Sequence, residues 1–234
     1  VIAAFAALGV RRVRLTGGEP LVRRDLPRLA GRLAALPGIE DLSLSTNAVQ
    51  LARHAQTLRT NGVRRLNVSL DSLNRARLRR ITGRDVLLRV TDGLLAAKRH
   101  GFAPIKINMV VMADTAAAEI DDMVAFCIAH GFVLRLIEVM PMGATGQRSG
   151  FADLRPVRER LQRRFGLVGG LIPGGGPARY LVAPDGRFSM DKWDGYVASR
   201  NRLYARLKET RAPNPVILSG DVHHAELLRH HPAR

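Results

Sequence analysis

The chain contains 234 residues, enough for one large domain, or for a domain and a fragment, with a sizeable core. No run approaches 18 consecutive apolar residues, which excludes a transmembrane helix. The first ten residues lack a basic segment and a cleavage site, so they predict a helix rather than a signal peptide. The single cysteine, Cys127, excludes a disulfide framework and any zinc or iron–sulfur centre held by several cysteines of this chain.

The charge is strongly positive, with 37 basic against 20 acidic residues and a formal net charge of +17. Nearly all of the basic residues are arginines, and they are spread along the whole length. A nucleic-acid binder usually gathers its charge in a stripe and adds exposed aromatic residues for stacking. Here aromatic residues make up only 5% of the chain. The composition therefore favours a phosphate-bearing small ligand over nucleic acid.

Short β-type runs alternate five times with amphipathic helix-type segments, which is typical of a parallel α/β array. Glycines stand between several helix patterns and the strands that follow, where they end helices. The predicted strands are residues 12–16, 41–45, 65–70, 105–112 and 133–140. The predicted helices are residues 24–36, 51–59, 74–81, 85–100, 118–130 and 154–165.

The predicted strands alternate between apolar and polar residues, whereas fully buried parallel strands usually read as continuous Val, Ile and Leu. In the first strand, Val13 and Leu15 alternate with Arg14 and Thr16. If helices cover the apolar face, the polar face must meet water or a polar ligand, because each unpaired buried polar group costs about 1–3 kcal/mol. The pattern predicts an α/β fold in the form of an open, incomplete parallel barrel with a ligand-filled lumen.

Polar motifs follow three successive strands, at the edge where parallel α/β enzymes build their sites. The first is Gly17-Gly18-Glu19-Pro20, whose glycines allow a ligand to approach the backbone closely. The others are Ser-Thr-Asn at residues 45–47 and Asn-Val-Ser-Leu-Asp-Ser-Leu at residues 67–73. Taken singly, each motif is also typical of an ordinary turn or helix cap.

These motifs, together with Lys-Ile-Asn at 106–108 and Arg-Leu-Ile-Glu-Val-Met-Pro-Met-Gly at 135–143, stand in the order found in a known family. Residues 1–183 resemble the radical S-adenosylmethionine (SAM) enzymes named GTP 3′,8-cyclase, or molybdenum cofactor biosynthesis protein A. The resemblance implies an incomplete barrel of the radical SAM type whose first strand is missing. It also implies conversion of GTP to a cyclic pyranopterin precursor, which a 5′-deoxyadenosyl radical starts by abstracting hydrogen from the ribose.

The resemblance also implies two sets of binding residues, while no catalytic side chain is assigned. The predicted SAM ligands are Gly17, Gly18, Glu19, Ser69 and Met140, and the predicted GTP ligands are Arg14, Ser45 and Lys106. The alternation of the strands independently places Arg14, Ser45, Ser69 and Lys106 on the polar faces. Met140 is equally compatible with a place in the core.

The cysteine motifs that hold the family's [4Fe–4S] clusters are not found among these residues. Cys127 lies on an apolar helix face and is predicted to be a core residue. The chain is therefore expected to be inactive by itself. The alternatives left open are a non-catalytic nucleotide- or SAM-binding protein and a metal-dependent phosphatase-like fragment.

Residues 184–234 are predicted to be a separate C-terminal segment, because the family pattern stops near residue 183. Residues 189–223 resemble part of the PhoD-type alkaline phosphatases, with Gly-Asp-Val-His at 220–223 after an apolar run. Asp221 and His223 are therefore weak candidate metal ligands. A fragment without function is the alternative. For the whole chain, the expectations are a cytoplasmic location, no membrane partner and a family-type homodimer.

Overall fold

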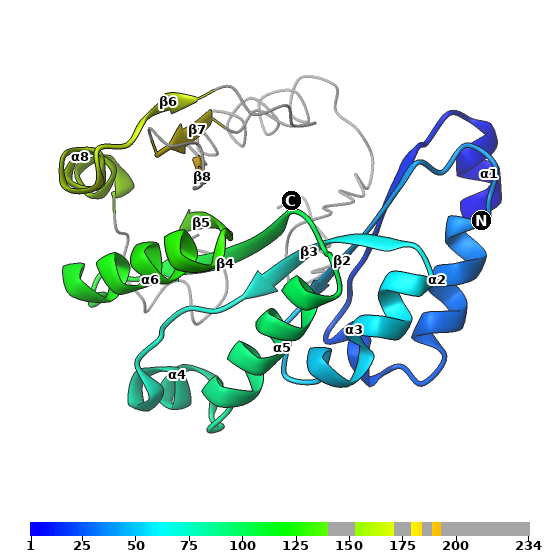
Figure 1. Ribbon diagram of the computed structural model, residues 1–234, viewed down its shortest axis with the longest axis horizontal. Helices are drawn as coiled ribbons and strands as arrows, with labels where there is room; N and C mark the ends of the chain where they lie inside the picture. The colour runs from blue at the N-terminus through cyan, green and yellow to red at the C-terminus, as the bar shows by residue number, and fades with distance from the viewer. Residues whose placement is uncertain (140–152, 171–178, 184–188, 193–234) are drawn as a thin grey trace, which may run out of the picture. The chain divides into compact units, whose positions relative to one another are not determined.

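A computed structural model of the chain describes residues 1–139, 153–170, 179–183 and 189–192 (Figure 1). The chain divides into two compact units, residues 1–193 and 194–234, and all described residues lie in the first. The helices of this unit are α1 (Ile2–Ala7), η1 (Pro20–Val22), α2 (Leu26–Ala34), α3 (Leu51–Thr60), α4 (Arg75–Thr82), α5 (Leu87–Arg99), α6 (Ala117–His130) and α8 (Leu154–Phe165).

The strands form one sheet in the order β1-β2-β3-β4-β5-β8-β7-β6. Strands β1 to β5 lie in chain order and are parallel to one another, which confirms the predicted array. β8 continues the parallel part beside β5, and β7 and β6 add two antiparallel strands. The strands are β1 (Arg12–Leu15), β2 (Asp41–Thr46), β3 (Val63–Ser69), β4 (Ile105–Val111), β5 (Val133–Glu138), β6 (Val168–Gly170), β7 (Arg179–Val182) and β8 (Ser189–Lys192).

The last three strands were not predicted, and pairing in the sheet continues beyond the expected boundary at residue 183. β8 pairs with β5 from Val133↔Ser189 to Leu136↔Lys192. These strands are three or four residues long, and Gly-rich and Pro-rich sequence surrounds them, so no alternation long enough to indicate a strand develops.

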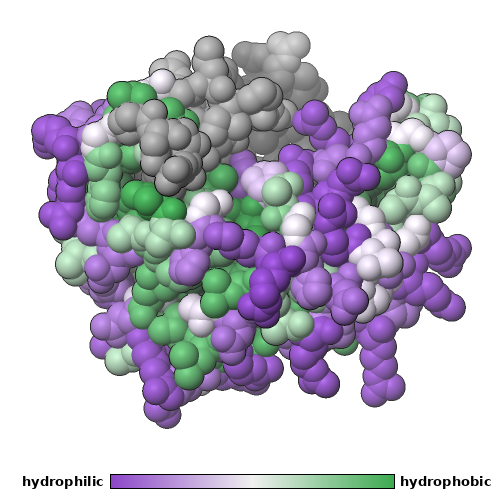
Figure 2. All heavy atoms as spheres, viewed as in Figure 1, coloured by the Kyte–Doolittle hydropathy of each residue, from purple (hydrophilic) through white to green (hydrophobic). Residues whose placement is uncertain are grey.

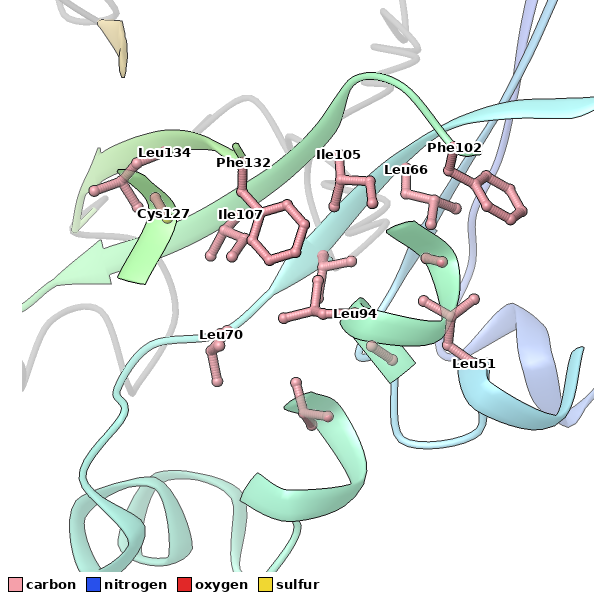
Figure 3. Packing of buried hydrophobic residues seen from close by; sticks show 14 of the residues in the cluster. Leu51, Leu66, Leu70, Leu94, Phe102, Ile105, Ile107, Cys127, Phe132 and Leu134 are labelled. Atoms are coloured by element: carbon pink, nitrogen blue, oxygen red, sulfur yellow. The ribbon is translucent and has the colours of Figure 1, made fainter. Parts of the chain in front are cut away.

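One hydrophobic cluster joins the apolar face of the sheet to the helices. Figure 3 shows side chains of β3, β4 and β5 pointing toward α3, α5 and α6, with Leu66 and Ile107 opposite Leu94. In Figure 1, α2, α3, α5 and α6 lie on the same side of the sheet. Apolar residues at every second position of the strands thus pack against the apolar residues that recur about every 3.6 positions in the helices, and together they form a single layer.

Local sequence signals explain where several helices begin and end. Asn74 caps α4, since its Oδ1 accepts a hydrogen bond from the backbone N–H of Arg77, and Asp153 caps α8 in the same way. α4 ends at Gly83, which has the left-handed conformation at φ +71° that glycine adopts without strain. This turn directs the chain back toward the start of α4.

Candidate functional site

The face of the sheet opposite the cluster carries most of the residues predicted to bind ligands. Successive side chains of a strand point to opposite faces, and paired residues of neighbouring strands point to the same face. Arg14 is paired with Ser43, and Ser45 is paired with Asn67. Asn67 is in turn paired with Lys106. Arg14, Ser45, Ser69 and Lys106 therefore share one face, as their alternation in the sequence predicts.

We call this the polar face, and define it by Arg14, Ser43, Ser45, Arg65, Asn67, Ser69, Lys106, Asn108 and Arg135. β3 has a bulge opposite β2, because the pairs Leu42↔Val63 and Ser43↔Arg65 leave Arg64 as an extra residue. The bulge shifts the pairing register of β3 by one residue. Arg65 thereby joins the polar face, where it forms an ion pair with Asp41. On the other side, Asn108 is paired with both Ser69 and Arg135. The sequence motifs contained Arg135 but assigned it no role; its signal is the alternation with Leu134 and Leu136.

Part of the polar face is buried although it is hydrophilic, while Arg14 at its β1 edge is exposed. Ser43, Asn67, Asn108 and Arg135 are all less than a tenth exposed. Among the described residues, the Oδ1 atom of Asn108 has no hydrogen-bond partner, and this residue is only 8% exposed. Leaving a buried acceptor unpaired costs about 1–3 kcal/mol. An external donor, either water or a ligand, is what this atom lacks.

The Gly17–Pro20 loop joins the end of β1 to the end of β2 through Glu19. Its Oε1 accepts hydrogen bonds from Thr46 Oγ1 at 2.7 Å and from the Leu21 N–H at 3.1 Å, while Oε2 accepts from the Asn47 N–H at 2.7 Å. Glu19, a predicted SAM ligand, also anchors the loop through these contacts.

The two glycines of this loop border open space. Gly17 has φ +147°, a conformation that L side chains rarely adopt, and a Cβ atom at either Gly17 or Gly18 would meet nothing within 4 Å. Backbone groups are therefore accessible there to a ligand. This open space is compatible with the SAM ligand that the family resemblance predicts for Gly17 and Gly18.

A hydrogen-bonded network supports the segment after β3. Asp71 Oδ1 accepts from the Val110 N–H at 2.8 Å and so ties this segment to β4. Ser72 Oγ donates to Glu119 Oε2 at 2.8 Å, which ties it to α6. These contacts fix the polypeptide next to Ser69. The sequence analysis did not identify them, because they join residues up to 47 positions apart.

Arg77 lies at the centre of a second group of contacts beside this segment. It is 7% exposed, donates to Asp114 Oδ1 at 2.7 Å, and has its Nε 3.4 Å from Glu119 Oε2. The hydrogen bond from Arg77 lowers the pKa of Asp114 from its ordinary value, and the same bond raises the pKa of Arg77. α4 is thereby fixed to the start of α6.

Cys127 is fully buried in the core, and burial raises the pKa of its thiol. A thiol that stays protonated and inaccessible cannot hold a metal cluster, which agrees with the predicted core role. In the part of the chain that the structure describes, no three His, Cys, Asp or Glu side chains are grouped to hold a metal ion. Met140, Asp221 and His223 lie outside the described residues.

Known proteins match the chain along different parts of its length. The model of the radical SAM superfamily matches residues 1–127. GTP 3′,8-cyclases of Pseudomonas entomophila and Pseudomonas fluorescens are 39% and 37% identical to it, over 97% and 99% of this chain and 70% and 72% of their own lengths. The chain belongs to the GTP 3′,8-cyclase family of radical SAM proteins. This membership implies use of SAM and of an iron–sulfur cluster.

The identity is higher over a shorter stretch. The GTP 3′,8-cyclase of Gloeobacter violaceus is 44% identical over 182 residues, which cover 77% of this chain and 56% of that protein. The chain spans about half the length of several curated relatives that it matches in this way. The model of PhoD-like phosphatases matches residues 142–232.

Solved structures support the fold. Streptococcus suis SuiB bound to S-adenosylmethionine has a TM-score of 0.52 and 19% identity, over 66% of this chain and 36% of that chain. Coproporphyrinogen III oxidase (HemN) of Escherichia coli has a TM-score of 0.54 and 15% identity, over 86% and 49%. The fold is an incomplete α/β barrel of the radical SAM type. No described helix is long and apolar enough to cross a membrane.

Proposed function

We propose that the chain contains the SAM-binding and GTP-binding face of a GTP 3′,8-cyclase, the enzyme that forms a cyclic pyranopterin precursor in molybdenum cofactor biosynthesis. The observation that carries the proposal is the buried, unpaired Oδ1 of Asn108 between Ser69 and Arg135. A buried acceptor without a partner requires an external hydrogen-bond donor.

The proposed SAM site consists of the Gly17–Glu19 loop together with Ser69 and Asn108. The open space at the two glycines leaves their backbone groups accessible, and Glu19 holds the loop in place. SAM carries donors in its ammonium group and its ribose hydroxyls, and Asn108 Oδ1 supplies an acceptor. Met140 belongs to the same proposal on the strength of the family motif.

The proposed GTP site uses the cations and the hydroxyl groups of the polar face. Lys106 of β4 and Ser45 of β2 are both paired with Asn67 of β3, and Arg14 lies on the same face. Several positive charges on one face suit a triphosphate, because hydrogen bonds between ionised groups are about twice as strong as neutral ones.

The iron–sulfur cluster does not fit the side chains of this chain. A [4Fe–4S] cluster is held by cysteine thiolates, and the one cysteine here is a buried thiol with a raised pKa. Ligand binding, and not radical formation, is what these residues can support. We therefore expect that the chain by itself incorporates no cluster and forms no 5′-deoxyadenosine.

Calorimetric titration of the full chain with GTP tests the proposal. Lys106→Gln should weaken GTP binding about tenfold or more, the effect of losing one charge-assisted contact. Lys98→Gln, which removes an exposed lysine of α5, should change the affinity less than twofold. Equal affinities of the wild type and the Lys106 variant would contradict the proposed GTP site. Anaerobic reconstitution that yields a stoichiometric cluster and 5′-deoxyadenosine would contradict the expected lack of activity.

A second candidate function is supported by the PhoD-like match. We propose that the part of the predicted segment 184–234 that follows β8 is phosphatase-like, with Asp221 and His223 as remaining metal ligands. Metal-dependent hydrolysis of p-nitrophenyl phosphate that is lost in Asp221→Asn would support it. No hydrolysis with Zn²⁺, Mn²⁺ or Ca²⁺ would leave the segment without this function.

The family-type homodimer is checked by light scattering, and the cytoplasmic location by cell fractionation.

A further inference from the structure

A pocket that no ligand assignment includes lies on α4 and on the turn that follows it. Its volume is about 560 Å³, and Arg75, Ala76, Arg79, Arg80, Gly83 and Asp85 line it. This volume lies within the range of about 300–1,000 Å³ that is typical of small-molecule sites. The pocket is built by residues 75–85 alone, none of which belongs to the polar face.

Three of the residues around the pocket are arginines, and one of these is already neutralised. Arg75 donates from Nε to both carboxylate oxygens of Asp85, at 2.8 Å and 2.9 Å, and its Nη2 contacts the same carboxylate. Gly83 makes this contact possible, because its left-handed turn brings Asp85 back to Arg75. One wall of the pocket is therefore fixed by an ion pair.

The other two arginines have no such partner. Among the described residues, the side chains of Arg79 and Arg80 form neither a hydrogen bond nor an ion pair, and both residues are exposed. Three arginines and one aspartate leave an excess of two positive charges. Figure 2 shows hydrophilic side chains distributed over the visible face rather than gathered in a single stripe. An open pocket beside two arginines without an ion-pair partner among the described residues is thus a local feature of α4.

We propose that this arginine pocket binds a phosphate-bearing small ligand, with Arg79 and Arg80 as the anion-contacting residues and Arg75 as their support. Guanidinium groups present paired N–H donors that match the oxygens of a phosphate bidentately. A diphosphate group matches the excess charge and uses more of the volume than a single phosphate ion. The site is separate from the proposed GTP site, so either of them can fail alone.

Titration of the full chain with inorganic pyrophosphate tests the pocket. The double variant Arg79→Gln/Arg80→Gln should weaken binding at least tenfold. The matched double variant Arg53→Gln/Arg89→Gln removes the same charge from exposed positions on α3 and α5, and should change binding less than twofold. Equal weakening by both pairs, or no binding by the wild type, would overturn the proposal. Thermal denaturation of each variant shows whether it is folded.

Two further variants separate the pocket from general electrostatics and from the polar face. Asp85→Asn releases Arg75 for the ligand and should tighten pyrophosphate binding about threefold or more, whereas unchanged or weaker binding would contradict the assignment. Weakening by Lys106→Gln, with none by the Arg79/Arg80 variant, would move the site to the polar face. Binding of duplex DNA with the same dependence on Arg79 and Arg80, in the absence of pyrophosphate binding, would also overturn the proposal.

Discussion

The helix-covered face of the sheet and its polar face differ in both burial and chemistry, since the first is almost fully buried and the second only in part. On β4, Ile107 and Met109 contact the helices and are fully buried, while Asn108 between them is 8% exposed and has an unpaired acceptor. The apolar side chains need no further partner, since they require only close contact. Asn108 Oδ1, in contrast, lacks a hydrogen-bond donor among the described residues. We infer that the apolar face provides stability, and that the polar face gives up some stability to leave room for a ligand.

The largest expected effect is on the apolar face. Ile107→Ala should lower the free energy of unfolding by about 2–5 kcal/mol, because it removes buried methylene groups and leaves a cavity. Urea denaturation measures the change. Lys106→Gln, next to it on the polar face, serves as the control and should cost less than about 1 kcal/mol while weakening GTP binding. Similar losses of stability at both positions would contradict the claim that the apolar face contributes more to stability than the polar face.

A smaller effect is expected at the anchor of the glycine loop. Glu19→Gln replaces one acceptor oxygen by an amide NH₂ group, which cannot accept a hydrogen bond. At least one of the three hydrogen bonds is therefore lost, at a cost of about 1–2 kcal/mol. Glu40→Gln breaks only an exposed ion pair with Arg11 and should cost less than about 1 kcal/mol. If Glu19→Gln leaves stability and SAM affinity unchanged, Glu19 does not hold the loop.

The pH dependence at Asp114 is the smallest effect. Its pKa is lowered in the folded state by the hydrogen bond from Arg77. The contact therefore stabilises the fold above the ordinary pKa of 3.8, and this contribution is lost as the pH falls through the lower folded value. Between pH 6 and pH 3, the melting temperature of Asp114→Asn should fall less than that of the wild type. Asp122→Asn, an exposed aspartate of α6, should match the wild type, and identical curves for all three would refute the role of Asp114.

Period-two alternation predicted both the five parallel strands and the face on which Arg14, Ser45, Ser69 and Lys106 lie. That information is local, because each strand is four to seven residues long and its faces differ in polarity. The bulge at Arg64 was not predictable in the same way. It depends on how β3 pairs with β2, and the sequence of β3 alone does not determine this.

The contacts around α4 could not be predicted for a related reason. Four of its eight residues are arginines, a pattern that indicates a solvated helix, yet Arg77 is buried against Asp114 and Glu119. Its partners lie 37 and 42 positions away, so only the tertiary structure brings them together. The same applies to the unpaired state of Asn108, which is a property of its surroundings and not of the sequence motif.

Urea unfolding of the wild type and of Asn108→Leu, each with and without SAM, tests the central claim most directly. Leucine has the branching of asparagine without its unpaired acceptor, so the variant without SAM should be at least as stable as the wild type, by up to about 1 kcal/mol. SAM at about 100 times its dissociation constant should stabilise the wild type by about 2.7 kcal/mol, and the variant by at least about 1 kcal/mol less. A variant that is less stable without SAM, but gains as much from SAM as the wild type, would contradict the account.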